Sequence, residues 1–184
     1  MKKIVLFLIS FITLVTVAEA QKFITKTGYI RFFSTTPMED IEAHNRQVNA
    51  ALDAETGDLV FKVLMKSFQF EKALMQEHFN ENFVESDKFP NSSFKGKITN
   101  LQDIDFTKNG KYDINIEGDL TIKDVTKKIN EKGTIEVNGD KIKGLSTFYT
   151  QVADWNIKVP GTVAANIAKS IRVDVNVDLE KFNK

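Results

Sequence analysis

The chain has 184 residues, with 25 basic and 25 acidic side chains and no formal net charge. This balance lacks the basic excess of a nucleic-acid-binding protein, so we expect no nucleic-acid partner. The chain also contains no cysteine, which excludes a disulfide framework and a lipidated cysteine behind a signal peptide.

The N-terminus predicts export. Residues 1–20 combine a positive Lys2-Lys3 pair, an apolar core and an Ala18-Glu19-Ala20 cleavage site, the three parts of a secretory signal peptide. An uncleaved membrane anchor is the alternative, but the apolar core is shorter than the roughly 20 residues that span a bilayer. We expect cleavage between Ala20 and Gln21. The mature protein should be periplasmic or secreted, with one domain over residues 21–184 and no integral membrane segment.

The first part of the mature chain predicts three strands. Residues 22–35 and 41–54 are separated by a break at Thr36-Pro37, and a turn at residues 55–58 leads into residues 59–65. Apolar and polar side chains alternate in the second and third of these segments. A return strand directly after a short turn is typical of a β-hairpin.

The sequence period changes over residues 71–85. Side chains recur there at spacings of three and four, which predicts one substantial α-helix. The helix must end before Pro90, because the residue before a proline is disfavoured in the helical conformation. A second, short helix is expected at about residues 162–168. The predicted stripe of the first helix consists of Leu74, Met75, His78, Phe79, Asn82 and Phe83.

Antiparallel β-structure is predicted most clearly by residues 111–137. Apolar and polar side chains alternate strictly as far as Lys123-Asp124, and the alternation then returns up to Asn138-Gly139, a strong hairpin signal. Further amphipathic strands are expected over residues 94–98, 142–148 and 171–179. Seven or eight such strands form a sandwich or a barrel, and their length favours an antiparallel barrel of about eight strands in a mainly β fold.

Three segments carry a family resemblance. They are MQEHFNENFVESDKFPNSSFKGKI at residues 75–98, GDLTIKDVTKKI at 118–129 and STFYTQVADWNIKVP at 146–160. All three resemble segments of the YceI-like family of secreted, lipid-binding proteins. The first resembles the family's helix with its aromatic-proline turn and Ser-x-Phe-x-Gly strand, and the second its Gly-x-Leu-Thr-Ile-x-Gly-Val-Thr hairpin. The third resembles the family's Asp-(Trp/Tyr)-Asn-Ile turn. The Asp-x-x-His-Ser start of many members is absent, so no role of that start is carried over.

The resemblance implies a lipocalin-like barrel that holds a long apolar molecule of polyisoprenoid, isoprenoid quinone or fatty amide type. Burial of each methylene contributes about 0.8 kcal/mol, whereas association costs about 4 to 15 kcal/mol, so we expect long chains to bind best. The oligomeric state stays open, a dimer included. The side chains expected to line the lumen are Phe61, Met65, Phe68, Met75, Phe79, Phe94, Gly96, Ile98, Ile114, Ile116, Leu120, Gly144, Phe148 and Trp155.

The contents of the interior are left open by the sequence. Phenylalanine side chains can fill a packed core or line a cavity. The inward glycines Gly96, Gly118, Gly133 and Gly144 either permit strand curvature or leave room for a ligand. Trp155 either plugs one end of the barrel or forms the rim of an entrance. If the phenylalanines fill the barrel, the alternative function is a stress-related periplasmic interaction protein.

An enzyme ranks third among the hypotheses. His44 and His78 are the only histidines, so a zinc site would need at least two carboxylate ligands. Glu77, Glu81 and Glu85 lie one turn apart near His78, a pattern typical of the solvated face of a helix. No nucleophile, phosphate-loop or dinucleotide motif occurs. We therefore expect no catalytic residues, no metal and no cofactor.

Overall fold

The computed structural model describes residues 21–182. Within them the chain forms nine strands, and eight of these close an antiparallel barrel in the order β1-β9-β8-β7-β6-β5-β3-β2, with β2 pairing back to β1. The predicted mainly β, lipocalin-like barrel is confirmed. The barrel strands are β1 (Lys22–Thr35), β2 (Asp40–Asp53), β3 (Asp58–Leu64), β5 (Asn91–Ile98), β6 (Gly110–Ile122), β7 (Val125–Asn138), β8 (Lys141–Gln151) and β9 (Ser170–Lys181).

The predicted strands agree with these bounds to within a few residues, because the period-two alternation fixes which face of each strand is buried. In β2 and β3 the inward side chains Val48, Leu52 and Leu59 are all buried. The turn between β6 and β7 consists of Lys123 and Asp124, both with positive φ (48° and 70°), which is the backbone required by a two-residue hairpin turn.

The helical segment is shorter than predicted. The α-helix α1 (Ala73–His78) continues into a single π-helical turn, Phe79–Phe83, in place of the predicted residues 71–85. Lys72 is still extended (φ −103°, ψ 124°) and Glu85 has a positive φ of 49°, so the backbone leaves the helical region at both ends. The predicted helix at residues 162–168 is only a 3-10 turn, Ala164–Asn166, because the chain is extended again at Ile167.

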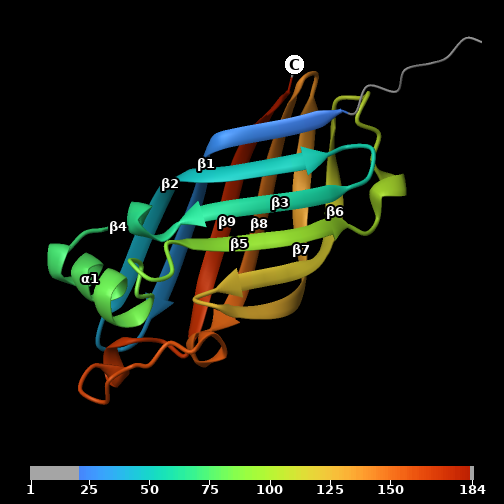
Figure 1. Cartoon of the computed structure of the whole chain (residues 1–184). Helices are drawn as coiled ribbons and strands as arrows, with labels where there is room; N and C mark the ends of the chain where they lie inside the picture. Colours follow the sequence, from blue (N-terminus) through green and yellow to red (C-terminus); the bar gives the residue numbers. More distant parts are fainter. Residues whose placement is uncertain (1–20, 183–184) are drawn as a thin grey trace, which may run out of the picture.

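The remaining short elements lie outside the barrel wall. β4 (Gln69–Phe70) adds a two-residue strand to β2, and 3-10 helices occupy Met65–Ser67, Leu101–Asp103 and Val152–Trp155. Figure 1 shows α1 and the loop that follows β8 at one end of the barrel, whereas the C-terminus lies at the opposite end. We call the first of these ends the covered end. No helix within residues 21–182 is long and apolar enough to cross a membrane.

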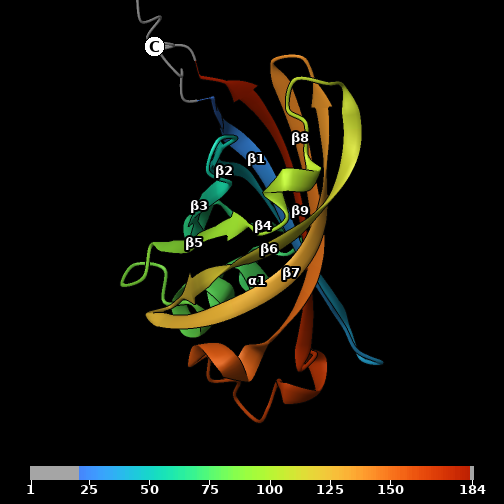
Figure 2. The same ribbon diagram turned by 90° about the vertical axis from the view of Figure 1, so that its right-hand side faces the viewer.

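The strands β7 and β8 pair along only part of their length. Their ladder runs from Asn138 opposite Lys141 to Gly133 opposite Ser146, and the rest of β8 pairs with β9 alone. Figure 2 shows β7 curving away from β8 toward the covered end. The loop after β8 approaches β7 at this point, where Lys127 forms an ion pair with Asp154 and its ammonium lies 6.0 Å from the Trp155 ring centroid.

The barrel interior has two parts. The half away from the covered end is a packed core, which includes Phe23, Leu52, Ile98, Ile142 and Leu179, all at most 3% exposed. A second cluster around Ile30, Val63, Met65, Phe68 and Val84 belongs to the half beneath the covers. The signal peptide predicted over residues 1–20 lies outside the described residues.

Candidate functional site

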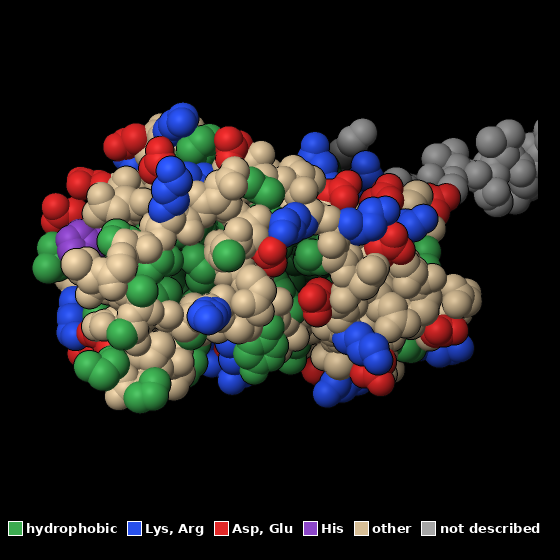
Figure 3. All heavy atoms as spheres, turned by 90° about the horizontal axis from the view of Figure 1, so that it is seen from below, with side chains coloured by type: hydrophobic (Ala, Val, Ile, Leu, Met, Phe, Trp, Pro, Cys, Tyr) green, Lys and Arg blue, Asp and Glu red, His purple; other side chains and the backbone are tan. Residues whose placement is uncertain are grey.

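A cavity of about 310 Å³ opens in the covered half of the barrel. Its wall is formed by the ends of the strands that meet there, by α1 and its π-helical turn, and by residues 152–167 of the loop after β8. Seen from this end, the molecule has a hollow with hydrophobic side chains inside it (Figure 3). The aromatic side chains of the wall are Phe32, Phe68, Phe70, Phe79, Phe83, Phe148 and Trp155.

An aromatic cluster fixes the helical cover to the barrel. The ring of Phe32, from β1, lies 5.3 to 5.6 Å from the rings of Phe68, Phe70 and Phe79, measured between centroids. Phe70 and Phe79 also contact each other, at 5.1 Å. Such tilted and edge-on pairs stabilise their arrangement beyond the burial of area. The cluster therefore holds the π-helical turn against β1 and gives the cavity a wall of aromatic rings.

The predicted helical stripe is only partly directed inward. Met75, His78, Phe79 and Phe83 reach the cavity, whereas Leu74 is 60% exposed. The six-residue α1 lies at the mouth of the barrel and covers the cavity with one side, so the stripe that faces the interior is narrower than the spacing predicted.

Several polar groups at the cavity have hydrogen-bond partners within the protein. Glu39, in the turn between β1 and β2, forms an ion pair with Lys72 at 2.8 Å and accepts a hydrogen bond from Asn166 at 3.1 Å. The hydrogen bond from Lys72 and the one from Asn166 hold the pKa of Glu39 below its usual value. Ser34 accepts a hydrogen bond from the Ala168 backbone N–H at 2.8 Å. These contacts tie both covers to the rim and leave the wall mainly apolar.

A second junction ties the covers to the β6–β7 turn. The ammonium of Lys123, which is 9% exposed, forms an ion pair with Glu85 and donates hydrogen bonds to the carbonyl oxygens of Phe83 at 3.1 Å and Asn156 at 3.4 Å. The hydrogen bond from Lys123 lowers the pKa of Glu85. Lys123, Glu85 and Asn156 all have positive φ. Three tight turns therefore meet at one buried lysine.

Half of the predicted lining residues lie on the cavity wall. The structure brings together Met65, Phe68, Met75, Phe79, Leu120, Phe148 and Trp155. The other predicted residues lie deeper in the barrel, in or beside the packed core. These are Phe61, Phe94, Gly96, Ile98, Ile114, Ile116 and Gly144. Whether the wall residues bind a ligand stays a prediction.

The inward glycines mark close contacts within the barrel. A Cβ added to Gly96 would lie 2.3 Å from the Glu117 carbonyl oxygen and 2.5 Å from Cζ of Phe94, and one added to Gly118 would lie 2.6 Å from the same Cζ. At Gly144 a Cβ would lie 3.0 Å from Val177. Gly96, Gly118 and Gly144 therefore make room for neighbouring strands and for side chains of the protein itself, and not for a ligand.

Trp155 plugs the space between the loop and the barrel. It is 2% exposed, and its Nε1 donates a hydrogen bond to the Thr150 hydroxyl at 2.7 Å. Because its ring also lies on the cavity wall, the residue is a buried part of the wall. This buried position agrees better with the prediction that Trp155 plugs one end of the barrel than with the prediction that it forms the rim of an entrance.

Several wall residues were missed by the sequence reasoning. They come from β1, from β9 and from the loop after β8, and they are Ile30, Phe32, Ile157, Val159, Ile171 and Val173. The alternation in residues 171–179 does place Ile171 and Val173 on the inner face. Their position at the cavity depends on the register of β9 with β1, where Val173 pairs with Phe32, and that register joins segments about 140 residues apart.

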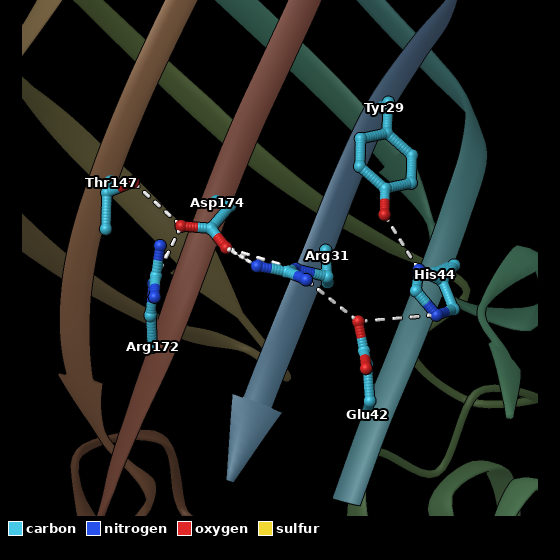
Figure 4. Close-up of polar contacts among 7 residues, drawn as sticks. All are labelled: Tyr29, Arg31, Glu42, His44, Thr147, Arg172 and Asp174. Carbon is cyan, nitrogen blue, oxygen red and sulfur yellow. Dashed lines mark hydrogen bonds and ion pairs between the residues drawn. The ribbon is translucent and has the colours of Figure 1, made fainter.

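The outer surface of the same wall carries a polar network (Figure 4). Arg31, on β1, forms ion pairs with Asp174 on β9 at 2.6 Å and with Glu42 on β2 at 3.0 Å. Burial acts to raise the pKa of Asp174, but hydrogen bonds from Arg31, Thr147 and Arg172 outweigh it and leave this pKa below its usual value. The network links four neighbouring strands behind the cavity.

The two histidines occupy different surroundings. His44 lies on the outer surface, where Nδ1 is 2.7 Å from the Tyr29 hydroxyl and Nε2 is 3.5 Å from Glu42. His78 lies at the cavity edge. Among residues 21–182, no three or more His, Asp or Glu side chains lie close enough together to hold a metal ion.

Comparisons with known proteins agree with this architecture. A polyisoprenoid-binding domain from Saccharophagus degradans, implicated in plant cell wall breakdown, superimposes with a TM-score of 0.77 at 9% identity, covering 89% of this chain and 100% of the other. BcnA of Burkholderia cenocepacia gives a TM-score of 0.67 at 13% identity, covering 83% of this chain and 95% of BcnA. A Campylobacter jejuni YceI protein gives 0.53 at 16% identity, with both chains fully covered.

Because these identities are low, the similarity to the solved structures shows a shared fold only. No curated protein matches the sequence. The model of the YceI-like domain matches residues 16–179, nearly the whole chain, and this protein therefore belongs to the YceI-like family.

Proposed function

We propose that this protein is an exported binding protein that carries the apolar chain of a lipid inside its barrel, without catalysis. The observation that carries the proposal is the cavity of about 310 Å³, with its mainly apolar wall, beneath the two covers. Its size lies within the range of small-molecule sites. The ligand types that we propose are a polyisoprenoid, an isoprenoid quinone or a fatty amide, and the polyisoprenoid-binding domain from Saccharophagus degradans supports this choice.

Burial of the chain supplies the binding free energy. About ten enclosed carbons contribute roughly 8 kcal/mol at about 0.8 kcal/mol per methylene. This gain is offset by an association cost of about 4 to 15 kcal/mol, so binding depends on enclosing the chain well. The polar groups Glu39, Lys72 and Asn166 already bind one another at the rim. Because these groups are already paired, we place the head group of the ligand outside the mouth.

The alternative, a barrel filled by its own side chains, fits only the half of the barrel away from the covers. Its side chains are packed to at most a few per cent exposure. The covered half differs because its phenylalanine rings surround open space. This difference favours a carrier over an interaction protein with a filled interior.

The carrier proposal is tested by filling the cavity. Val173→Phe adds a ring on the wall, whereas Leu145→Phe adds the same ring on the outer face of β8, where Leu145 is 41% exposed. Mass spectrometry of organic extracts should find lipid with the gently purified wild type and with Leu145→Phe, and little with Val173→Phe. If the wild type carries no lipid and binds none on titration, the carrier proposal is wrong.

Export is proposed from the predicted signal peptide at residues 1–20. N-terminal sequencing of the protein recovered from its native host should begin at Gln21. An exported protein that still begins at Met1 would contradict export by signal cleavage.

A further inference from the structure

We propose that Phe94 and Phe61 form a floor that limits the lipid chain enclosed by this barrel to about 12 carbons. The inference rests on the proposed carrier function, and it assigns a chain-length specificity to the same cavity. It changes the expectation for long ligands, because a chain longer than this limit would extend out of the mouth.

The two phenylalanines do not line the cavity themselves and form the layer beneath its wall. Ser92 and Val63 are on the cavity wall, and Phe94 and Phe61 are the next inward positions along β5 and β3, since inward side chains recur every second residue. Phe61 and Phe94 are register partners. Their rings contact edge to face, with centroids 6.3 Å apart and planes at 62°. The pair thus spans two neighbouring strands at one level of the barrel.

Two glycines leave the space that the ring of Phe94 occupies. Its Cζ is 2.5 Å and 2.6 Å from the positions that Cβ atoms of Gly96 and Gly118 would take. These two glycines are themselves register partners on β5 and β6. A side chain at either position would displace the ring. The ring of Phe94 therefore packs against Gly96 and Gly118, and Phe94 is 8% exposed.

The barrel is filled beneath this level. Leu59, Ile98 and Ile114 are buried there and belong to the packed core. Phe61, Ile157 and Val175 contact this core and also the cluster beside the cavity, so they lie at the boundary between the two parts. A ligand chain that reaches Phe94 can go no deeper without displacing core side chains.

The cavity volume sets the chain length. A cavity of about 150 Å³ holds one benzene, which has six carbons, so about 310 Å³ corresponds to roughly 12 carbons. Each enclosed methylene strengthens binding about fourfold, because 0.8 kcal/mol corresponds to this factor. The association cost is nearly constant along a homologous series. Affinity should therefore rise steeply with chain length and then level off.

The test is a titration of delipidated protein with linear 1-alkanols of 8, 10, 12, 14 and 16 carbons. Trp155 is the only tryptophan of the chain and lies on the wall, so its fluorescence reports binding. We expect the dissociation constant to fall about 15-fold per two carbons up to roughly 12 carbons and then to change less than threefold. A constant slope through 16 carbons would overturn the floor and leave the carrier function standing. If no alkanol binds at any length, the carrier function fails as well.

Removing the floor should shift the limit. In Phe94→Ala the vacated ring volume should move the plateau to longer alkanols, by up to about six carbons. Phe23→Ala, a matched loss of the same ring in the packed core away from the cavity, should leave the plateau unchanged. Phe94→Leu serves as a milder variant if Phe94→Ala does not fold. An unchanged plateau in a folded Phe94 variant would also overturn the inference, and the wild-type series decides if neither variant folds.

Discussion

Replacing Lys123 by methionine should lower the free energy of unfolding by about 2 to 3 kcal/mol and loosen both covers of the cavity. Methionine keeps most of the buried stem of the side chain and removes only the ammonium. Since Lys123 has a positive φ of 48°, and methionine meets the same backbone restriction as lysine, the comparison isolates the charged group.

The magnitude follows from the contacts of the ammonium. Its hydrogen bonds to the carbonyl oxygens of Phe83 and Asn156, at 3.1 and 3.4 Å, join the end of the helical cover to the loop after β8. Hydrogen bonds to charged groups contribute about 1.5 to 3 kcal/mol when one partner is removed. The hydrogen bond to Asn156 is long, and the ion pair with the partly exposed Glu85 is screened by solvent. We therefore expect a total loss of about 2 to 3 kcal/mol, the upper part of the range for a single hydrogen bond to a charged group.

Thermal unfolding of the mature protein measures this effect. For a protein of about this size, 1 kcal/mol shifts the midpoint by about 2 to 4 °C, so we expect a decrease of roughly 5 to 10 °C. Lys128→Met is the matched control, because Lys128 is 65% exposed and contacts Glu117 at 3.4 Å. The control should change stability by less than about 0.5 kcal/mol. Equal midpoints for the two variants would refute the role of Lys123 as a junction.

Three further predictions concern ionisable side chains elsewhere in the protein. Asp174→Asn should cost about 1.5 kcal/mol at pH 7 by weakening the network on the outer face, whereas Asp178→Asn, at an exposed position on the same strand, should not. Because the folded pKa of Asp174 is lowered, its contribution is complete above the unfolded pKa of about 3.9 and is lost as the pH falls through the folded value. Chemical unfolding of both variants between pH 7 and pH 3 checks this, and an unchanged profile in Asp174→Asn would contradict it. Burial raises the pKa of Glu131, so its charged form is disfavoured on folding and its contribution is lost as the pH rises through the folded value. Glu131→Gln should therefore raise the unfolding midpoint slightly at pH 7 and have no such effect near pH 4, and a lowered midpoint at pH 7 would count against this reasoning. His78→Ala should leave the metal content unchanged and well below one zinc per chain by elemental analysis, and a stoichiometric zinc lost in this variant would favour an enzyme.

The sequence by itself determined the strands and favoured a barrel over a sandwich. Alternation along residues 112–122 and 171–179 assigns each side chain to one face, and this assignment needs no knowledge of the partner strand. The helical segment could be located for the same reason, although its ends could not. The helix begins after Lys72 because the backbone of Lys72 is extended, and it ends before Glu85 because Glu85 has a positive φ. The position of Glu85 is held by a tertiary contact, its ion pair with Lys123.

Only the tertiary structure decided which inward side chains surround open space. Phe148 and Phe94 are both inward phenylalanines on barrel strands, yet the first lines the cavity and the second lies beneath it. Period two fixes the face of a strand but not the level of a side chain along the barrel axis. That level depends on the registers between strands and on the close approach of Gly96 and Gly118, which seats the ring of Phe94 and divides the interior into a cavity and a core.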